Sequence, residues 1–449
     1  MISRMIMTSS AKRAAIALGL LAVLAGSGLG TAGVLDPDAR ASADPDRSHG
    51  KSGVCLKSVA PTVLSTLGEV AMRVYHEGVA SERTAAALSF IARSIPLREA
   101  VERGDAQATR AAAEALTASG HMTNLEVFDR TSTAAEDAGK VLANVGPPNA
   151  LAPLRGTIVG AQGVPIATFI ASVWADDGFI SEADGITQGA VALRVNGHSI
   201  AGSFALPSRK LPTHGTLTER GVAYQYTSFP AAVFPTGSLR VYLLRSISST
   251  TALCGQSEQA TLVHTLSRVA SLIYEAEDGA SALKQLAHVQ QDSALLQAVS
   301  AHDEAATREA VLGVLHAGTH VVRMRVLAAD GGLLSDVGGP DVLAPVRAPL
   351  RLHGRTIGSV VISIQDDLGY RLLAQRLAGL RVVMYRNPTH PKVVMSSFPV
   401  TPAGIPAEGK FRYQGHEYDV FTLQAEAFPS GPLRISVLIP IPYTSPPSS

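Results

Sequence analysis

The spacing of hydrophobic positions changes in the same order in each half of the chain. Residues 57–103 and 256–301 carry apolar side chains three and four positions apart, as at Leu262, Leu266 and Val269. This spacing places them on one face of a helix. The pattern predicts that each half begins with helices.

Glycine and aspartate indicate where these helices break and begin again. Gly78 and Gly279 are expected to interrupt the long first helix of each half. Asp105 and Asp303 stand where a helix N-cap is expected, each before a further helical run. Each half is therefore predicted to contain a long helix followed by shorter ones.

After the helical part, apolar and polar residues alternate with a period of two, which is typical of strands. In the second half the predicted strands are 321–328, 343–352, 356–366, 379–386, 394–399, 409–414, 417–424 and 432–440. Helices followed by a run of neighbouring strands indicate an α+β fold. We expect a twisted antiparallel sheet in each half, with the long N-terminal helix packed along one face.

The two halves also share residues in register, which indicates an internal duplication. Cys55 and Tyr75 are matched by Cys254 and Tyr274, 199 positions later. Further matched blocks are Val145-Gly146 with Val337-Gly338, Leu151–Pro153 with Leu343–Pro345, and Phe234-Pro235 with Phe428-Pro429. We predict two tandem domains, residues 55–247 and 254–442.

The N-terminus has the pattern of a secretory signal peptide. Arg4, Lys12 and Arg13 precede an apolar run, Ala14–Leu24, which continues as small residues to about Val34, and small-x-small steps follow at Ala39–Ala41 and Ala41–Ala43. We predict a signal peptide over 1–43, a flexible leader over 44–54 and a disordered tail over 443–449. The alternative is an uncleaved membrane anchor. The protein is thus expected to be secreted or extracytoplasmic.

Composition and charge indicate a folded protein and argue against one class of partner. The 449 residues are 46% hydrophobic and 17% charged, with a formal net charge of +1. There is ample apolar material for a core, and no excess of basic residues that would indicate a nucleic-acid partner.

Several segments of the second half resemble the Cache (PDC-like) extracytoplasmic sensor domains, which are PAS-like α+β modules. They are the Leu-x-x-Ala-Val string at 295–299, Asp303, the strand Val321–Leu327, the turn Ala329–Gly332, and Gly354–Gly358 before the next strand. The resemblance implies a small-molecule pocket between the sheet and its overhanging loops. Family members feed a cytoplasmic output module through membrane helices, and neither feature is evident here.

These observations predict an exported, sensor-type protein that binds a small organic ligand, such as a carboxylate or an amino-acid-like metabolite. It would act alone or present the ligand to a membrane protein. The alternative is a secreted or cell-envelope interaction module whose fold binds no ligand. We expect no nucleic-acid partner, no cofactor and no enzymatic activity.

Candidate ligand-binding residues lie along matched strands. Alternation would place them on one face of the sheet, where polar groups need partners that a ligand could supply. They are Ser172, Trp174 and Asp176 in the first half and Ser363, Gln365 and Asp367 in the second. Alternatively, this face is solvated or its polar groups are satisfied by neighbouring strands.

Two matched arginines are further candidates. Arg155 and Arg347 follow the shared Ala-Pro step near the start of a strand. A guanidinium held there could form a bidentate pair with a ligand carboxylate, or it could pair with a nearby aspartate.

Cys55 and Cys254 are the only cysteines, and they occupy matched positions. An exported chain favours oxidation, so we predict a disulfide between them. Two separate thiols are the alternative.

Enzyme and metal signatures are weak. Ser281 and Lys284 have the Ser-x-x-Lys spacing of serine acylases without the accompanying motifs. His316 and His320 are four residues apart but flank Gly318, where a helix is expected to end. We assign no catalytic or metal-binding residue.

Overall fold

The computed structural model describes residues 48–118, 122–129, 139–147, 149–316, 321–340, 342–386 and 391–444, without the side chains of 48–58, 82–83 and 250–252. The predicted signal peptide, most of the leader and most of the C-terminal tail lie outside these residues. The described chain from Gly50 onward belongs to one compact unit.

The described part of the first half begins with helices. They are α2 (Ser48–Ala80), α3 (Glu82–Arg93), α4 (Ile95–Glu102) and α5 (Ala106–Ala118). A first group of strands follows: β1 (Asn124–Phe128), β2 (Val141–Val145), β3 (Leu154–Val159) and β4 (Pro165–Ser172). Helix α6 (Asp176–Thr187) then leads to a second group: β5 (Ala190–Val195), β6 (His198–Gly202), β7 (His214–Glu219), β8 (Val222–Val233) and β9 (Gly237–Ser246).

The second half, which follows the 3-10 helix η3 (Ile247–Leu253), has a similar order of elements. Its first helices are α7 (Glu258–Glu277), α8 (Ala280–Val289), α9 (Ser293–Ser300) and α10 (Glu304–His316). The strands β10 (Arg323–Ala328), β11 (Leu333–Gly338), β12 (Val342–Leu343), β13 (Val346–Leu352), β14 (Arg355–Ser363) and β15 (Gln365–Asp366) come next. Helix α11 (Asp367–Ala378) precedes β16 (Arg381–Arg386), β17 (Lys392–Ser396), β18 (Gly409–Tyr413), β19 (His416–Glu426) and β20 (Pro432–Ile441).

The strand orders of the two halves correspond. The four-stranded sheets have the orders β2-β1-β4-β3 and β11-β10-β14-β13, and the five-stranded sheets β6-β5-β9-β8-β7 and β17-β16-β20-β19-β18. Strand pairs in these sheets are antiparallel, as in β8 with β9 and β19 with β20. The predicted α+β class with antiparallel sheets is therefore confirmed.

Two details differ from the sequence expectation. The first half divides its strands between two sheets, and the second half adds a two-stranded sheet, β12-β15, to its own two; a helix, α6 or α11, lies between the four-stranded and the five-stranded sheet in the chain. These helices begin within four residues of the preceding four-stranded sheet, so their short apolar stretches merge with the strand pattern. Gly78 does not break the first helix, because α2 continues to Ala80, whereas Gly279 does separate α7 from α8.

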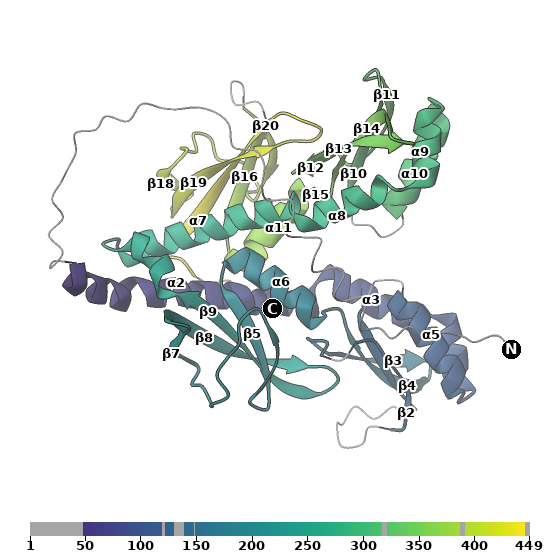
Figure 1. The fold of residues 1–449 in the computed structure, drawn as a ribbon, viewed down its shortest axis with the longest axis horizontal. Helices are drawn as coiled ribbons and strands as arrows, with labels where there is room; N and C mark the ends of the chain where they lie inside the picture. The colour runs from purple at the N-terminus through teal and green to yellow at the C-terminus, as the bar shows by residue number, and fades with distance from the viewer. Residues whose placement is uncertain are drawn as a thin grey trace. The chain divides into compact units, whose positions relative to one another are not determined.

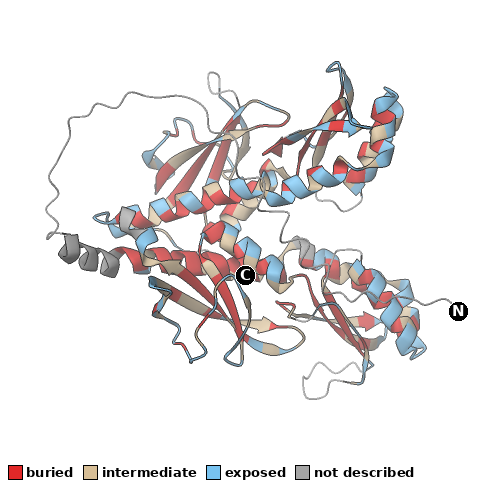
Figure 2. Ribbon diagram, viewed as in Figure 1, coloured by how far each residue is buried: buried red, intermediate tan, exposed pale blue. Residues whose placement is uncertain are grey.

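The long helices pack on the five-stranded sheets. Helix α2 lies along the β5–β9 sheet and α7 along the β16–β20 sheet (Figure 1). Their buried faces, together with α6 and α11, belong to one hydrophobic cluster that draws residues from both halves, visible as the red helix and strand faces in Figure 2. One buried polar contact in this region joins the halves, from Arg73 Nη1 to the Leu377 carbonyl at 2.9 Å.

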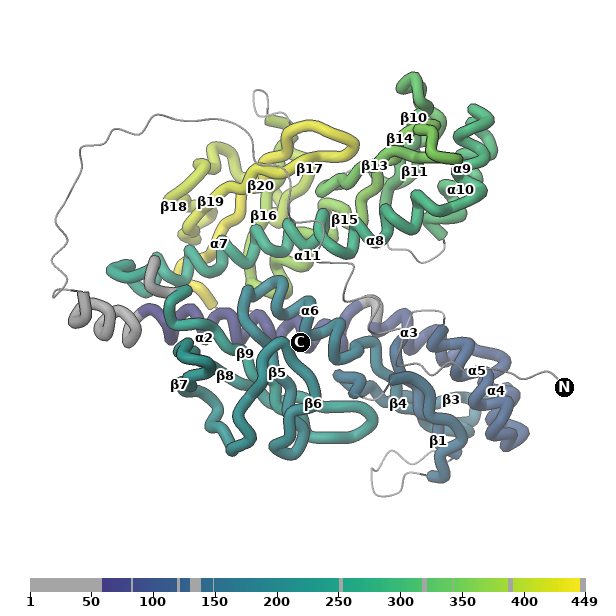
Figure 3. The backbone as a smooth tube through the Cα atoms, viewed as in Figure 1, coloured from purple at the N-terminus to yellow at the C-terminus, as the bar shows by residue number. Residues whose placement is uncertain are grey.

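The four-stranded sheets have cores of their own. Helices α3 to α5 cover one of them through residues such as Ile91, Leu97 and Leu116. Helices α8 to α10 cover the other, where Leu286 and Val299 pack against strand residues, and this group is traced in Figure 3. Within the described residues, no helix combines the length and hydropathy needed to cross a membrane.

Candidate functional site

Ser172 and Ser363 occupy the same place in the two halves and are fully buried. Each hydroxyl donates to a backbone carbonyl that precedes the adjacent strand by three residues, Leu151 before β3 for Ser172 and Leu343 of β12 before β13 for Ser363. Each also accepts from the backbone N–H two residues further on. These serines are satisfied by the backbone, so they hold the end of the strand and leave no polar group for a ligand.

Asp176 and Asp367 do not continue the strand pattern. Strand β4 ends at Ser172, and both aspartates are the first residues of helices α6 and α11. The expectation that residues 172, 174 and 176 share one sheet face is therefore wrong at its last position, because the chain turns into a helix. Asp176 accepts a hydrogen bond from the Asp177 N–H at 2.9 Å, and Asp367 is buried.

The two matched arginines lie on the four-stranded sheets. Arg155 is exposed on β3, away from the pockets described below. Arg347 on β13 forms a salt bridge with Glu426 and donates to the Pro429 carbonyl at 3.1 Å. Arg347 thus has an acidic partner within the chain, which was the alternative to a ligand role.

Trp174 and Gln365, the most unlike matched pair, line the same pocket. We call it the interhelix pocket, a cavity of about 560 Å³. Its lining residues come from α2, the N-cap of α3, the segment before α6, α6 itself, β15 and α11: Val74, Glu77, Gly78, Ser81, Val173, Trp174, Glu182, Gln365, Gly369, Leu372, Leu373, Arg376 and Leu377. The sequence predicted two separate sites at these positions, and the structure brings them together.

Trp174 and Gln365 each contact one position on the long helix of their own half. A Cβ atom at Gly78 would lie 1.9 Å from Trp174 Cδ1, so the indole occupies the space that a side chain on α2 would need. Gln365 Nε2 donates to Glu277 Oε1 at 3.1 Å. Glu277 follows Gly78 by the same 199 positions that separate the tyrosines. The two halves therefore differ at both residues of this contact. The first half has Trp174 against Gly78, and the second half has Gln365 bonded to Glu277.

Acidic side chains dominate the charge of this region. Glu77 pairs with Arg376 at 3.0 Å across the halves, and Glu182 lines the pocket with no basic partner among the described residues. Burial, followed by the nearby Glu182 carboxylate, raises the pKa of Glu277 to about 8, against the hydrogen bond from Gln365, which lowers it. Burial also raises the pKa of Glu182. The arrangement favours a bound positive charge, which would stabilise the ionised carboxylates.

The indole N–H of Trp174 is a donor that the protein leaves unused. Trp174 Nε1 is buried and has no hydrogen-bond partner among the described residues. The ring itself is fixed by an edge contact with Phe179, the ring centroids 6.4 Å apart. A buried donor without an acceptor is unfavourable, and a ligand oxygen in the pocket would relieve it.

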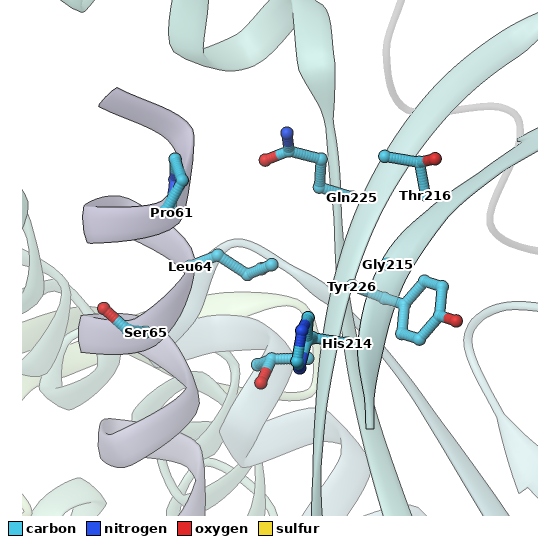
Figure 4. A pocket seen from close by; sticks show the side chains of 9 residues that line it. Pro61, Leu64, Ser65, His214, Gly215, Thr216, Gln225 and Tyr226 are labelled. Atoms are coloured by element: carbon cyan, nitrogen blue, oxygen red, sulfur yellow. The ribbon is translucent and has the colours of Figure 1, made fainter. Parts of the chain in front are cut away.

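A second kind of site occurs once in each half, between the long helix and the last sheet. The α2 groove, of about 380 Å³, is lined by nine residues: Pro61, Leu64, Ser65, His214, Gly215, Thr216, Gln225, Tyr226 and Thr227. Figure 4 shows Leu64 directed from α2 toward the strands and the Tyr226 ring directed to the opposite side of the sheet.

The α7 groove is its counterpart in the second half, with a volume of about 1110 Å³. The residues matched to all nine of the α2 groove line it, although its chemistry is more polar. Asp419 there accepts from Gln259 at 2.9 Å and pairs with Lys410 at 2.7 Å. Sequence reasoning missed both grooves; the repeat offsets applied to polar strand residues would have indicated them.

The faces of the five-stranded sheets that point away from the long helices are filled. In the first half, Leu206 and Leu211 from the loop after β6 pack on Tyr226 and Tyr242. Ile405 and Phe398 cover the equivalent face in the second half. The sequence resemblance placed a pocket beneath overhanging loops, and at these two sheets apolar side chains take up that space.

The predicted disulfide is only partly within the described residues. Cys254 lies just after η3 and Cys55 lies in α2, but the side chain of Cys55 is outside the described residues. Within the described part there is no free cysteine. The bridge itself stays a prediction. The same residues contain no group of three or more His, Cys, Asp or Glu side chains that could hold a metal ion.

No protein-family model matches the chain, and no curated protein matches it in sequence. Among solved structures, it is similar to the periplasmic domain of LuxQ from Vibrio cholerae, with a TM-score of 0.27 and 9% identity, over 42% of this chain and 100% of that one. It is also similar to the ligand-binding domain of the chemoreceptor Tlp3 from Campylobacter jejuni in complex with L-norvaline, with a TM-score of 0.25 and 10% identity, over 46% and 97%.

A third similar structure is an extracellular ligand binding receptor from Desulfohalobium retbaense, with a TM-score of 0.19 and 14% identity, over 37% of this chain and 41% of that one. The first of these structures is a periplasmic domain, the second a chemoreceptor ligand-binding domain and the third an extracellular ligand binding receptor. The likeness concerns the fold alone.

Proposed function

We propose that this protein is an internally duplicated, extracytoplasmic binding protein of the sensor type, and that the interhelix pocket takes a small amino-acid-like ligand. The observation that carries the proposal is the buried indole N–H of Trp174, which has no acceptor among the described residues and lies at a cavity that also presents carboxylates. A pocket of about 560 Å³ lies within the usual range for small-molecule sites.

The polar groups of this pocket suit a molecule with both charges. A ligand ammonium would be attracted to Glu182, and its charge would favour ionisation of Glu277, which lies behind Gln365. A ligand carboxylate would accept from the Trp174 indole and from the Arg376 guanidinium, which Glu77 holds in place. The apolar side chain of such a ligand would contact leucines of α11, such as Leu372 and Leu373.

The proposal is tested by thermal denaturation of the protein with a panel of L-amino acids, their decarboxylated amines and their deaminated acids. We expect amino acids to raise Tm and both truncated series to do so less. Trp174 is the only tryptophan, so binding should also change its fluorescence. Trp174→Phe keeps an aromatic ring and removes the donor, and we expect it to weaken binding about tenfold.

Arg155→Ala is the matched control, because Arg155 is exposed and outside the pocket. Equal affinity of Trp174→Phe and the unmodified protein for every stabilising ligand would exclude this pocket as the site.

The filled sheet faces favour a second candidate, a protein-interaction module with a sensor-like fold. Arg194 in the first half donates to the backbone carbonyls of Pro207 and Arg209, which fastens the covering loop against the sheet. A loop held in this way is suited to present a fixed surface. If no compound in the panel stabilises the protein, this candidate replaces the first.

A further inference from the structure

The outer edge of strand β19 is bonded at both ends and open in between. At one end β18 pairs with β19, from Tyr413 with His416 to Gly409 with Val420. Toward the other end, the Glu426 N–H donates to the Tyr274 hydroxyl at 2.8 Å, and the Glu426 carbonyl accepts from the Ala344 N–H at 3.1 Å. The edge between these points has no strand beside it among the described residues.

The register identifies which residues face this opening. Gln414 and Gly415 form a two-residue turn with positive φ at both positions, so Tyr413 and His416 are a hydrogen-bonded pair. In an antiparallel ladder such pairs recur at every second residue, so Val420 also bonds to β18. Continuing this two-residue spacing, the N–H and C=O of Thr422 and Gln424 point away from β20, toward the open edge. The bonds of Glu426 to Tyr274 and Ala344 lie on the same side, as the spacing requires.

The first half has the same edge, but it is blocked. There, Ala232 makes the terminal bonds, to the Tyr75 hydroxyl and the Ala152 N–H. The positions matched to Thr422 and Gln424 are Ser228 and Pro230. Pro230 has no N–H to offer, and proline is a common means of protecting an exposed edge. Because Gln424 has the backbone N–H that Pro230 lacks, the edge of β19 can pair with a further strand at this position and the edge of β8 cannot.

The open edge also has a groove beside it. Thr422 and Gln424 both line the α7 groove, which α7 bounds on its other side, and Figure 1 shows α7 running past β18 and β19. The charged lining is balanced, with Glu408 and Asp419 against Lys410 and Arg434. A balanced lining does not select a charged small molecule, whereas exposed main-chain donors and acceptors select another main chain.

We propose that the edge of β19 at Thr422 and Gln424 binds an extended peptide segment of a partner protein as an added strand. Two edge residues offer two N–H donors and two C=O acceptors, enough to fix a segment of about four residues. Alternate side chains of the peptide would enter the α7 groove, and the others would point away from it. This site is separate from the interhelix pocket and does not depend on it.

The experiment uses the full chain and random linear heptapeptides, capped at both ends and selected for binding to it. Selected peptides are then remade with one N-methylated amide at a time, and affinity is measured by fluorescence polarisation. We expect N-methylation to weaken binding at least tenfold at alternate residues and to have little effect at those between, because an added strand directs every second N–H to its neighbour.

Gln424→Pro removes the Gln424 N–H, one of the two main-chain donors that the protein would offer to the peptide. Pro230 at the matched position shows that the backbone of this edge accommodates proline, and an unchanged far-ultraviolet spectrum would verify folding. We expect Gln424→Pro to weaken binding about tenfold and Gln424→Ala, which keeps the N–H, to preserve it. Absence of any selected peptide, N-methyl effects without a two-residue period, or full binding by Gln424→Pro would overturn the proposal.

Discussion

The absence of a side chain at Gly78 determines how Trp174 is placed. The indole lies against the α2 backbone there and over Gly178 of α6, where a Cβ would be 3.7 Å from the ring. In the second half the corresponding pair is Gln365 with Glu277, joined by a hydrogen bond. The residue on the long helix, Gly78 or Glu277, and the residue before α6 or α11, Trp174 or Gln365, therefore differ as a pair between the halves.

Gly78→Ala should accordingly disturb this site. The helical backbone accepts alanine, so intrinsic helix propensity favours the change, but the new Cβ would overlap the indole. We expect a net loss of roughly 1–3 kcal/mol in the free energy of unfolding, measured by urea denaturation, and a shifted emission maximum for Trp174. Gly185→Ala, in α6 with open space around its Cβ, is the control, and a similar loss there would show that the overlap is not the cause.

The helices and many of the strands could be predicted from residue spacing, but their division into sheets could not. Strand periodicity is the same whether a strand joins a four-stranded or a five-stranded sheet, because it reports only alternation of faces. Helix α11 escaped notice because it begins only four residues after β14 ends, although its buried residues Tyr370, Ala374 and Leu377 have helical spacing. The serines were misread for a related reason, since a buried hydroxyl bonded to backbone looks identical in sequence to one awaiting a ligand.

The contact between helices α6 and α7 makes stability depend on pH. Glu277 at the end of α7 faces Glu182 on α6, Gln365 and the neighbouring Asp278, and its pKa is raised from an ordinary 4.5 to about 8. Between these values the folded chain holds a proton that the unfolded chain has released. Stability should therefore fall as pH rises from about 4.5 to about 8, and no further from this group above that.

Glu277→Gln should remove that part of the pH dependence. The glutamine cannot ionise, so we expect the variant to match the unmodified protein near pH 5 and to exceed it by roughly 2–4 kcal/mol near pH 8.5. Urea denaturation at both pH values measures the difference. Glu275→Gln, on the exposed side of α7 in a salt bridge with Arg268, is the control. Parallel pH curves for the Glu277 variant and the unmodified protein would contradict the expectation.

At the scale of the whole chain, the candidate site depends on packing between the halves. Comparison of matched positions selected Trp174 and Gln365 as the clearest difference between the halves, and both line the interhelix pocket. That they share one pocket follows from contacts between segments far apart in sequence, such as Glu77 with Arg376, which no local pattern encodes. The open edge of β19 was also not predicted. Comparison of the repeats could have indicated it, because Pro230 occupies the position in the first half that matches Gln424 in the second.

The predicted Cys55–Cys254 bridge would add a covalent link to the shared core. It would close a loop of about 200 residues, for which chain entropy gives roughly 5 kcal/mol of stabilisation, an upper value since native strain reduces it. We expect reduction to lower the urea midpoint of the unmodified protein and to leave that of a Cys55→Ser, Cys254→Ser variant unchanged. Near-complete labelling by a thiol reagent in the unfolded, unreduced protein would rule the bridge out. If the bridge forms, reduction should also quicken exchange of amides in α7 that face the other half, because the halves would then be joined by the chain through η3 and by noncovalent contacts without the disulfide.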